Sequence, residues 1–117
     1  MKYLLVVAAL ISAPVVAQTQ PSGAAVFAPC RACHTVNKGG KNGLGPNLNG
    51  VVGRKAGTVA GFNYSPAMKA YKKTWTRPLL DAYLSNPRVA IPGNKMIYPG
   101  MKDPAKRAAI ISYIMAQ

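Results

Sequence analysis

The chain has 117 residues, of which 15 are Lys or Arg, 2 are Asp or Glu, 1 is His and 2 are Cys, and its formal net charge is +13. This length fits one small domain. Two acidic side chains, Asp81 and Asp103, and a single histidine leave little material for a carboxylate pair or a polyhistidine metal site, which argues against the usual hydrolases. The large excess of positive charge indicates a negatively charged partner.

The N-terminus predicts a secretory signal peptide. Residues 3–11 form an apolar run that follows Lys2 and is too short to span a bilayer comfortably. The small residues that end at Ala17 match a signal-peptidase site, so we expect residues 1–17 to be removed and residues 18–117 to form one exported, periplasmic domain. A retained membrane anchor is the alternative. It is disfavoured because Ser12 and Pro14 interrupt the run and no stop-transfer pattern follows.

The rest of the chain predicts an all-α fold of three or four short helices joined by long loops. The expected helices span residues 23–28, 66–71, 77–86 and 104–115. A capping residue with a nearby proline opens each of the last three, at Ser65-Pro66, Thr76-Arg77-Pro78 and Asp103-Pro104. The third helix places Leu79, Leu80, Tyr83 and Leu84 on one face, and the last has Ile110, Ile111, Ile114 and Met115 as its apolar face with Arg107 on the outer side.

Between Gly39 and Gly61 the sequence shows neither a helical nor a strand period. A small domain with such a long loop usually needs a covalent or metal staple. A disulfide between Cys30 and Cys33 would close almost no loop and would stabilise little. We therefore expect a different group to hold the domain together.

The run Cys30-Arg31-Ala32-Cys33-His34 is typical of a c-type haem site. Two thiols at this spacing can each add to a vinyl group of one porphyrin, and the histidine then lies under the iron as a neutral imidazole ligand. A thioredoxin-like dithiol is the competing interpretation, but no βαβ pattern surrounds the motif. A closed zinc site would need a fourth Cys or His, which the chain lacks.

Because there is no second histidine, the opposite face of the iron requires another ligand, and methionine is the leading candidate. Met96 lies in a loop stiffened by prolines on both sides, which suits a thioether held at a fixed distance. Met101 is the second candidate. Met68 and Met115 lie in predicted helices and are expected in the core.

The chain resembles the class I cytochromes c, the small soluble bacterial and mitochondrial type, over nearly all of residues 18–117. The segments that carry the resemblance occur in the family's order: Cys30 to His34, Gly45 to Leu48, Gly53 to Lys55, Gly61 to Tyr64, Trp75, Tyr83 to Pro87, and Pro92 to Met96. The resemblance implies a class I cytochrome c fold around one haem c. It implies Cys30 and Cys33 as thioether anchors and His34 and Met96 as axial iron ligands.

The resemblance also assigns roles to the haem pocket. Pro46 would orient the His34 ring through its carbonyl, and Tyr83 would approach the methionine sulfur. Arg54, Tyr64 and Trp75 would bind the haem propionates; ordinary packing and surface charge are the alternative explanation for these residues. Three departures from the family pattern are Pro29, which should shorten the first helix, Met68 in place of a polar residue, and Asn94 in place of a threonine near a propionate.

A six-coordinate, largely buried iron favours a one-electron carrier over a catalyst. We expect a shuttle between a quinol-oxidising or substrate-oxidising donor and an oxidase, reductase or photosynthetic reaction centre. We also expect a monomer that meets acidic patches on these redox proteins through Lys41, Arg88, Lys95 and Lys102. The alternatives are a haem peroxidase or gas sensor with a labile sixth ligand, and a cationic protein whose cysteines are a simple dithiol. Nucleic acid is an unfavoured partner because of export.

Overall fold

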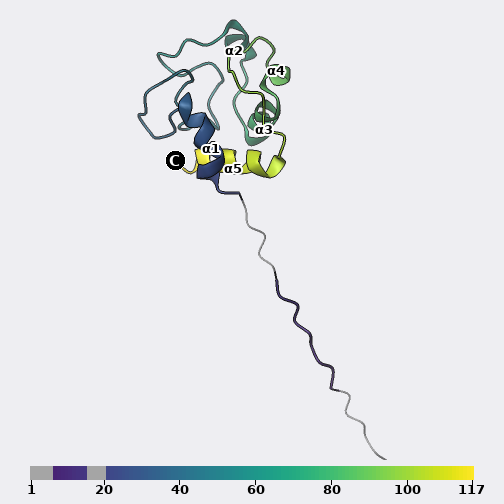
Figure 1. Ribbon diagram of the computed structural model, residues 1–117. Helices are drawn as coiled ribbons and strands as arrows, with labels where there is room; N and C mark the ends of the chain where they lie inside the picture. The colour runs from purple at the N-terminus through teal and green to yellow at the C-terminus, as the bar shows by residue number, and fades with distance from the viewer. Residues whose placement is uncertain (1–6, 16–20) are drawn as a thin grey trace, which may run out of the picture.

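The computed structural model describes residues 7–15 and 21–117, and it confirms the all-α fold (Figure 1). Its helices are α1 (Gly23–Phe27), the 3₁₀ helix η1 (Ala28–Ala32), α2 (Pro66–Tyr71), α3 (Arg77–Ser85), α4 (Pro87–Ala90) and α5 (Pro104–Met115). Apart from an isolated antiparallel bridge between Lys55 and Thr74, the described residues contain no β-structure. Within those same ranges, no helix is both long and apolar enough to cross a membrane.

Four helices begin at a side chain that accepts a backbone N–H, with proline in the first turn. Ser65, Thr76, Asn86 and Asp103 cap α2, α3, α4 and α5 in this way. The sequence predicted three of these starts. The expected third helix is shorter than predicted, because it ends at Ser85 and Asn86-Pro87 opens the separate helix α4.

The first helix is short, as Pro29 predicted. After Phe27 the chain tightens into η1, which has Pro29 in its first turn and carries Cys30. Phe27 is fully buried, and its ring centroid lies 5.1 Å from that of Tyr113 on α5. This aromatic therefore fills the interface between the two terminal helices.

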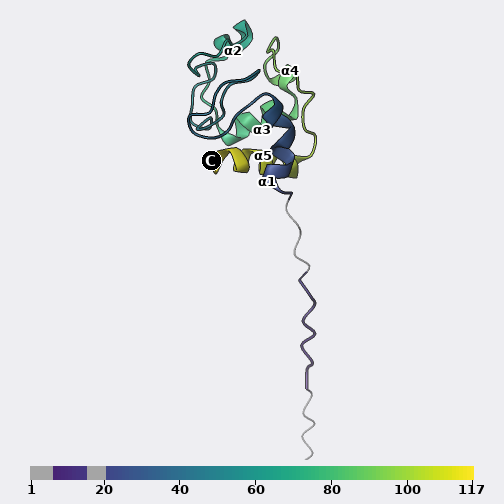
Figure 2. The same cartoon turned by 60° about the vertical axis from the view of Figure 1, so that its left-hand side comes forward.

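Helices α1, α3 and α5 form the packed base of the fold, and α1 crosses α5 in both views (Figures 1 and 2). At the crossing, a Cβ on Gly23 would lie 2.7 Å from the Tyr113 Cβ, so only glycine permits this approach. The core contains Leu80 and Tyr83 of α3 and the isoleucines of α5, as expected.

Two predictions about α5 are wrong. Met115 is 49% exposed, and its sulfur accepts a hydrogen bond from Arg77 instead of packing in the core. The Arg107 side chain is only 13% exposed and forms an ion pair with Asp81 of α3 at 2.7 Å. Arg107 lies on the side of α5 that α3 covers. The hydrophobic pattern of α5 alone does not show that another helix packs on this side.

Candidate functional site

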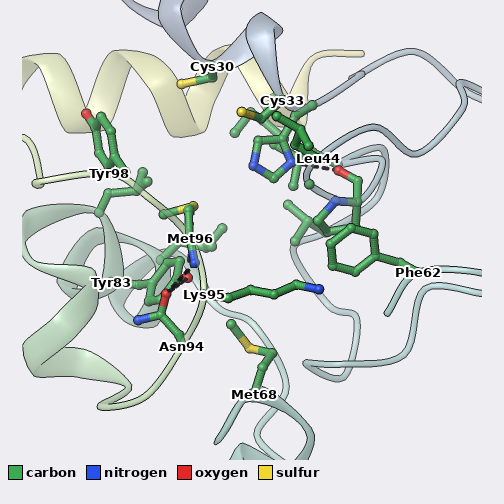
Figure 3. Close-up of a pocket in the computed structure, with 18 of the residues that line it drawn as sticks. Cys30, Cys33, Leu44, Phe62, Met68, Tyr83, Asn94, Lys95, Met96 and Tyr98 are labelled. Carbon is green, nitrogen blue, oxygen red and sulfur yellow. Dashed lines mark hydrogen bonds between the residues drawn. The ribbon is translucent and has the colours of Figure 1, made fainter. Parts of the chain in front are cut away.

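The loops above the helical base enclose one cavity of about 460 Å³ (Figure 3). All ten residues predicted for haem attachment, iron ligation or the haem pocket contribute to this region. All ten line the cavity: Cys30, Cys33, His34, Pro46, Arg54, Tyr64, Trp75, Tyr83, Asn94 and Met96. Most of the remaining wall is apolar, including Leu48, Val51, Leu80 and Ile114. The fold thus brings together ten predicted residues that are up to 66 positions apart in the sequence.

The His34 ring is fixed on two sides by backbone. Its Nδ1 lies 2.7 Å from the carbonyl oxygen of Pro46, and because a carbonyl only accepts, Nδ1 carries the proton. The lone pair is therefore on Nε2. Burial lowers the pKa of His34 against the opposing effect of the Pro46 hydrogen bond, which favours the neutral imidazole that a metal requires.

Gly45 leaves space for this ring. A Cβ at Gly45 would lie 2.3 to 2.6 Å from three atoms of the imidazole, far closer than atoms can pack. The amide of Gly45 also donates to the Cys33 carbonyl at 2.8 Å, which fastens the loop to the attachment segment. The proximal side of the cavity is therefore a close fit between ring and main chain.

Cys30 and Cys33 lie on η1 and on the residue that ends it, and both face the same cavity (Figure 3). The amides of Cys33 and His34 both donate to the Cys30 carbonyl, at 3.1 and 2.9 Å, so the motif forms one tight turn. Burial raises the pKa of the Cys30 thiol. Arg31, between the cysteines, points away to α5, where its guanidinium donates to the Tyr113 hydroxyl and lies 5.3 Å from the centre of the Phe27 ring.

The Met96 side chain enters the cavity from the loop that follows α4 (Figure 3). Its sulfur lies 3.9 Å from the Tyr83 hydroxyl, and its amide donates to the Asn94 side-chain oxygen at 3.0 Å. Burial raises the pKa of Tyr83 to about 12, so the phenol keeps its proton at neutral pH. The approach of Tyr83 to the methionine sulfur, which the resemblance implied, is present in the structure.

Met101 does not line the cavity, which removes the second candidate for the distal ligand. Its amide donates to the Leu84 carbonyl at 2.8 Å, and its carbonyl accepts from Arg107 at 2.9 Å. Gly100 precedes it at φ 106°, where a Cβ would lie 2.3 Å from the Ser85 oxygen. These contacts close the far end of the Met96 loop against α3 and α5.

Arg54 and Tyr64, predicted to bind propionates, already have protein partners. Arg54 donates to the carbonyls of Asn49 and Asn47 at 3.0 and 3.2 Å, and the Tyr64 hydroxyl accepts from the Val59 amide at 3.0 Å. A guanidinium has five N–H groups, so Arg54 keeps donors for an anion. Trp75 is 6% exposed and stacks between Tyr71 and Tyr83, with ring centroids 5.6 and 5.3 Å away.

Leu44, Phe62 and Tyr98 also line the cavity and were not assigned to the pocket from the sequence (Figure 3). Leu44 and Ile97, which also lines the cavity, are 82% and 96% exposed, unusual values for large aliphatic side chains. Position next to a predicted pocket residue was the available sequence signal for three of these residues. Leu44 precedes Gly45-Pro46, and Ile97 and Tyr98 follow Met96 directly. Loop residues without a period cannot be assigned to a face from the sequence.

The four cations predicted for the partner surface are all exposed: Lys41, Arg88, Lys95 and Lys102. Lys95 differs from the others because its ammonium also contacts a second loop. It donates to the Asn63 carbonyl and lies 4.8 Å from the centre of the Phe62 ring. Lys95 therefore ties the Met96 loop to the 61–64 loop across the cavity.

Comparison with known proteins explains this arrangement. The family model described as cytochrome c matches residues 21–117. The chain belongs to the cytochrome c family. Cytochrome c2 of Rhodomicrobium vannielii is 46% identical over 118 residues, which cover 99% of this chain and 94% of that protein. Cytochrome c2 iso-2 of Magnetospirillum fulvum is 52% identical over 88 residues, or 75% of this chain and 91% of that protein.

The structure of cytochrome cH from Methylobacterium extorquens superposes with a TM-score of 0.77 and 42% sequence identity, and the match covers 86% of this chain and all of that one. This cytochrome c is therefore a class I monohaem protein with covalently bound haem c. The cavity fits that group chemically, since it combines two thiols, a neutral imidazole, a thioether and an apolar wall. Gly45 supplies the space that the imidazole needs beside it.

Proposed function

We propose that this cytochrome c is a soluble one-electron carrier whose iron is ligated by His34 and Met96. The bound haem supplies the redox-active iron. Cys30 and Cys33 would hold the porphyrin as thioethers, while His34 Nε2 and the Met96 sulfur would occupy the two axial positions. One observation carries the proposal: each axial side chain reaches the same cavity and is fixed by a second group, Pro46 at 2.7 Å or Tyr83 at 3.9 Å.

A half-buried phenol, a buried indole and a half-buried guanidinium serve the negative end of the haem in this proposal. Tyr64, Trp75 and Arg54 would donate to the propionates, which offsets the cost of moving two carboxylates out of water. The existing bonds from Arg54 to Asn47 and Asn49 would hold its guanidinium in place before the haem is bound. A carrier benefits from such preorganisation because its pocket then changes little between the two oxidation states.

The partner surface would combine apolar contacts with surrounding positive charge. Leu44 and Ile97 are exposed at the cavity, and Lys41, Arg88, Lys95 and Lys102 are exposed cations. We propose that acidic patches on the donor and acceptor dock here, with charge mainly increasing the rate of encounter. The donor would be a quinol-oxidising or substrate-oxidising enzyme, and the acceptor an oxidase, reductase or photosynthetic reaction centre.

We further propose a periplasmic location after removal of residues 1–17. Residues 7–15, which lie in the proposed signal peptide, are exposed along their whole length. The cleavage site after Ala17 and the first six residues lie outside the described residues. N-terminal sequencing of the exported protein tests this step, and a mature chain that still begins at Met1 would contradict it.

The optical spectrum tests the ligand assignment. Ferric native protein should show the weak far-red band of a thioether bound to iron, and Met96→Ala should lack it. Met68→Leu is the matched control, because Met68 also lines the cavity but its loss should leave the band intact. A native protein without the band that binds carbon monoxide rapidly would contradict the carrier and favour the peroxidase or gas sensor.

A further inference from the structure

Asn94 occupies the centre of the contacts around Met96. Its Oδ1 accepts from the Met96 amide at 3.0 Å and from the Tyr83 hydroxyl at 3.3 Å. Its Nδ2 donates to the carbonyls of Pro87 and Ile91, both at 2.8 Å. One side chain thus joins α4, α3 and the Met96 loop.

These four bonds allow only one orientation of the Asn94 amide. If the group were flipped, Nδ2 would face the Met96 N–H and Oδ1 would face two carbonyl oxygens, so donors would meet donors and acceptors would meet acceptors. The oxygen is therefore held towards the Tyr83 hydroxyl. The Tyr83 ring is itself held, since it is 7% exposed and packs against Trp75 with centroids 5.3 Å apart.

The Tyr83 hydroxyl has one proton and two acceptors near it. Within the described residues, the groups at hydrogen-bond distance from this hydroxyl are Asn94 Oδ1 at 3.3 Å and the Met96 sulfur at 3.9 Å. An amide oxygen is a stronger acceptor than a thioether sulfur. Met68, which also lines the cavity, offers no N–H or O–H donor and only a weak acceptor.

We propose that Asn94 is a positioning residue that controls the electron density of the Met96 sulfur by competing with it for the Tyr83 proton. This inference rests on the proposed function, because it needs Met96 as the distal ligand. A hydrogen bond to the thioether withdraws electron density and weakens its donation to ferric iron. By drawing the proton away, Asn94 stabilises the ferric state and lowers the reduction potential.

The test is a double-mutant cycle on the holoprotein, read out as the reduction potential. Asn94→Ala frees the Tyr83 proton for the sulfur, so the potential should rise and the far-red band should move to shorter wavelength. Tyr83→Phe removes the proton, so the potential should fall. The double variant should have the potential of Tyr83→Phe, because without the hydroxyl Asn94 has nothing to compete for.

Equal shifts from Asn94→Ala in the native and Tyr83→Phe backgrounds would overturn the proposal, since Asn94 would then act only by holding the loop. Asn94→Val, which also lacks an acceptor for the Tyr83 proton, is taken through the same cycle, so the test stands if Asn94→Ala does not assemble with haem. Failure of the proposed function is distinguishable. In that case Met96→Ala would leave the native far-red band unchanged, whereas failure of this inference alone would leave the Met96 assignment intact and the cycle additive.

Discussion

The two sides of the cavity are built differently. On the proximal side, the His34 ring is fixed by main chain alone, through the Pro46 carbonyl and the close approach of Gly45. On the distal side, Met96 lies on a loop held by side-chain contacts: its own Asn94 and Lys95 bind neighbouring segments, and Tyr83 of α3 and Arg107 of α5 contact it from outside. A backbone fit resists displacement, whereas separate polar contacts can open one at a time. We therefore expect ligand exchange and local opening on the Met96 side.

The largest effect should come from filling the proximal space. Gly45→Ala places a Cβ within 2.6 Å of the imidazole, and overpacking of this kind costs about 3 kcal/mol. We expect loss of haem incorporation or a fall of that size in the free energy of unfolding, measured with guanidinium. Gly50→Ala is the control, because its Cβ would contact nothing within 4 Å and only the strain at φ 68° remains, about 1 to 2 kcal/mol. Equal losses in the two variants would contradict a rigid proximal fit.

Removing Arg107 should destabilise the far end of the Met96 loop. Arg107→Met breaks the 2.7 Å pair with Asp81 and the bonds to the Met101 and Lys102 carbonyls, at a cost of about 2 to 3 kcal/mol that allows for the partial exposure of Asp81. The far-red band should then disappear at a lower denaturant concentration than the helical signal. Arg77→Met, which removes exposed contacts to Ser112 and Met115, should cost less than about 1 kcal/mol. If the far-red band and the helical signal of Arg107→Met still disappear at the same denaturant concentration, the distal side of the cavity is not less stable than the rest of the fold.

Lys95 should contribute a smaller share of the loop's stability. Lys95→Met removes the cation–π contact with Phe62 and the bond to Asn63, worth about 1 kcal/mol together. If cyanide enters by opening of the Met96 loop, its association rate with the ferric Lys95→Met protein should rise about fivefold above the native rate. Lys102→Met removes the same charge from an exposed side chain and should leave the rate near the native value. Matching rates in both variants would assign the effect to charge alone.

The last expected effect appears only at alkaline pH. The pKa of Tyr83 is about 12 in the folded chain and near 10 when unfolded, so between these values only the unfolded state has released the proton. The free energy of unfolding of ferrous protein should therefore fall as pH rises from about 10 to 12, and this part of the fall should be absent in Tyr83→Phe. Urea titrations across that range measure it. Identical slopes in the two proteins would show that Tyr83 is as accessible in the folded state as in the unfolded state.

Capping residues followed by proline predicted where helices begin. Ser65-Pro66 and Asp103-Pro104 opened helices as expected, and Asn86-Pro87 carries the same pattern. We interpreted Asn86-Pro87 as the end of α3, which it is, and missed that it also starts α4. A four-residue helix has too short a span for a period to show.

The candidate site was predictable where chemistry is concentrated in a motif, as at Cys30, Cys33 and His34, and where the resemblance supplied an order of segments. The partners of long side chains were not predictable. Arg107 was expected on the outer side of α5 but pairs with Asp81, which lies 26 positions away; Lys95 is exposed as expected, and it donates to Asn63, which lies 32 positions away. Only the folded chain brings such pairs together, because neither α5 nor the Met96 loop carries a local signal for them.

Both acidic side chains of the molecule have roles in the fold, since Asp81 pairs with Arg107 and Asp103 caps α5. The exposed cations of the surface are therefore not balanced by a free carboxylate side chain. Two copies of this protein approach as like charges, so we expect electron exchange between a reduced and an oxidised copy to be slow at low ionic strength. Added salt, which screens charge beyond about 8 Å under physiological conditions, should speed that exchange and slow encounter with the proposed acidic partner. Because both aspartates are used within the fold, we expect the protein to exchange electrons with its own copies more slowly than with the proposed acidic partner at low ionic strength.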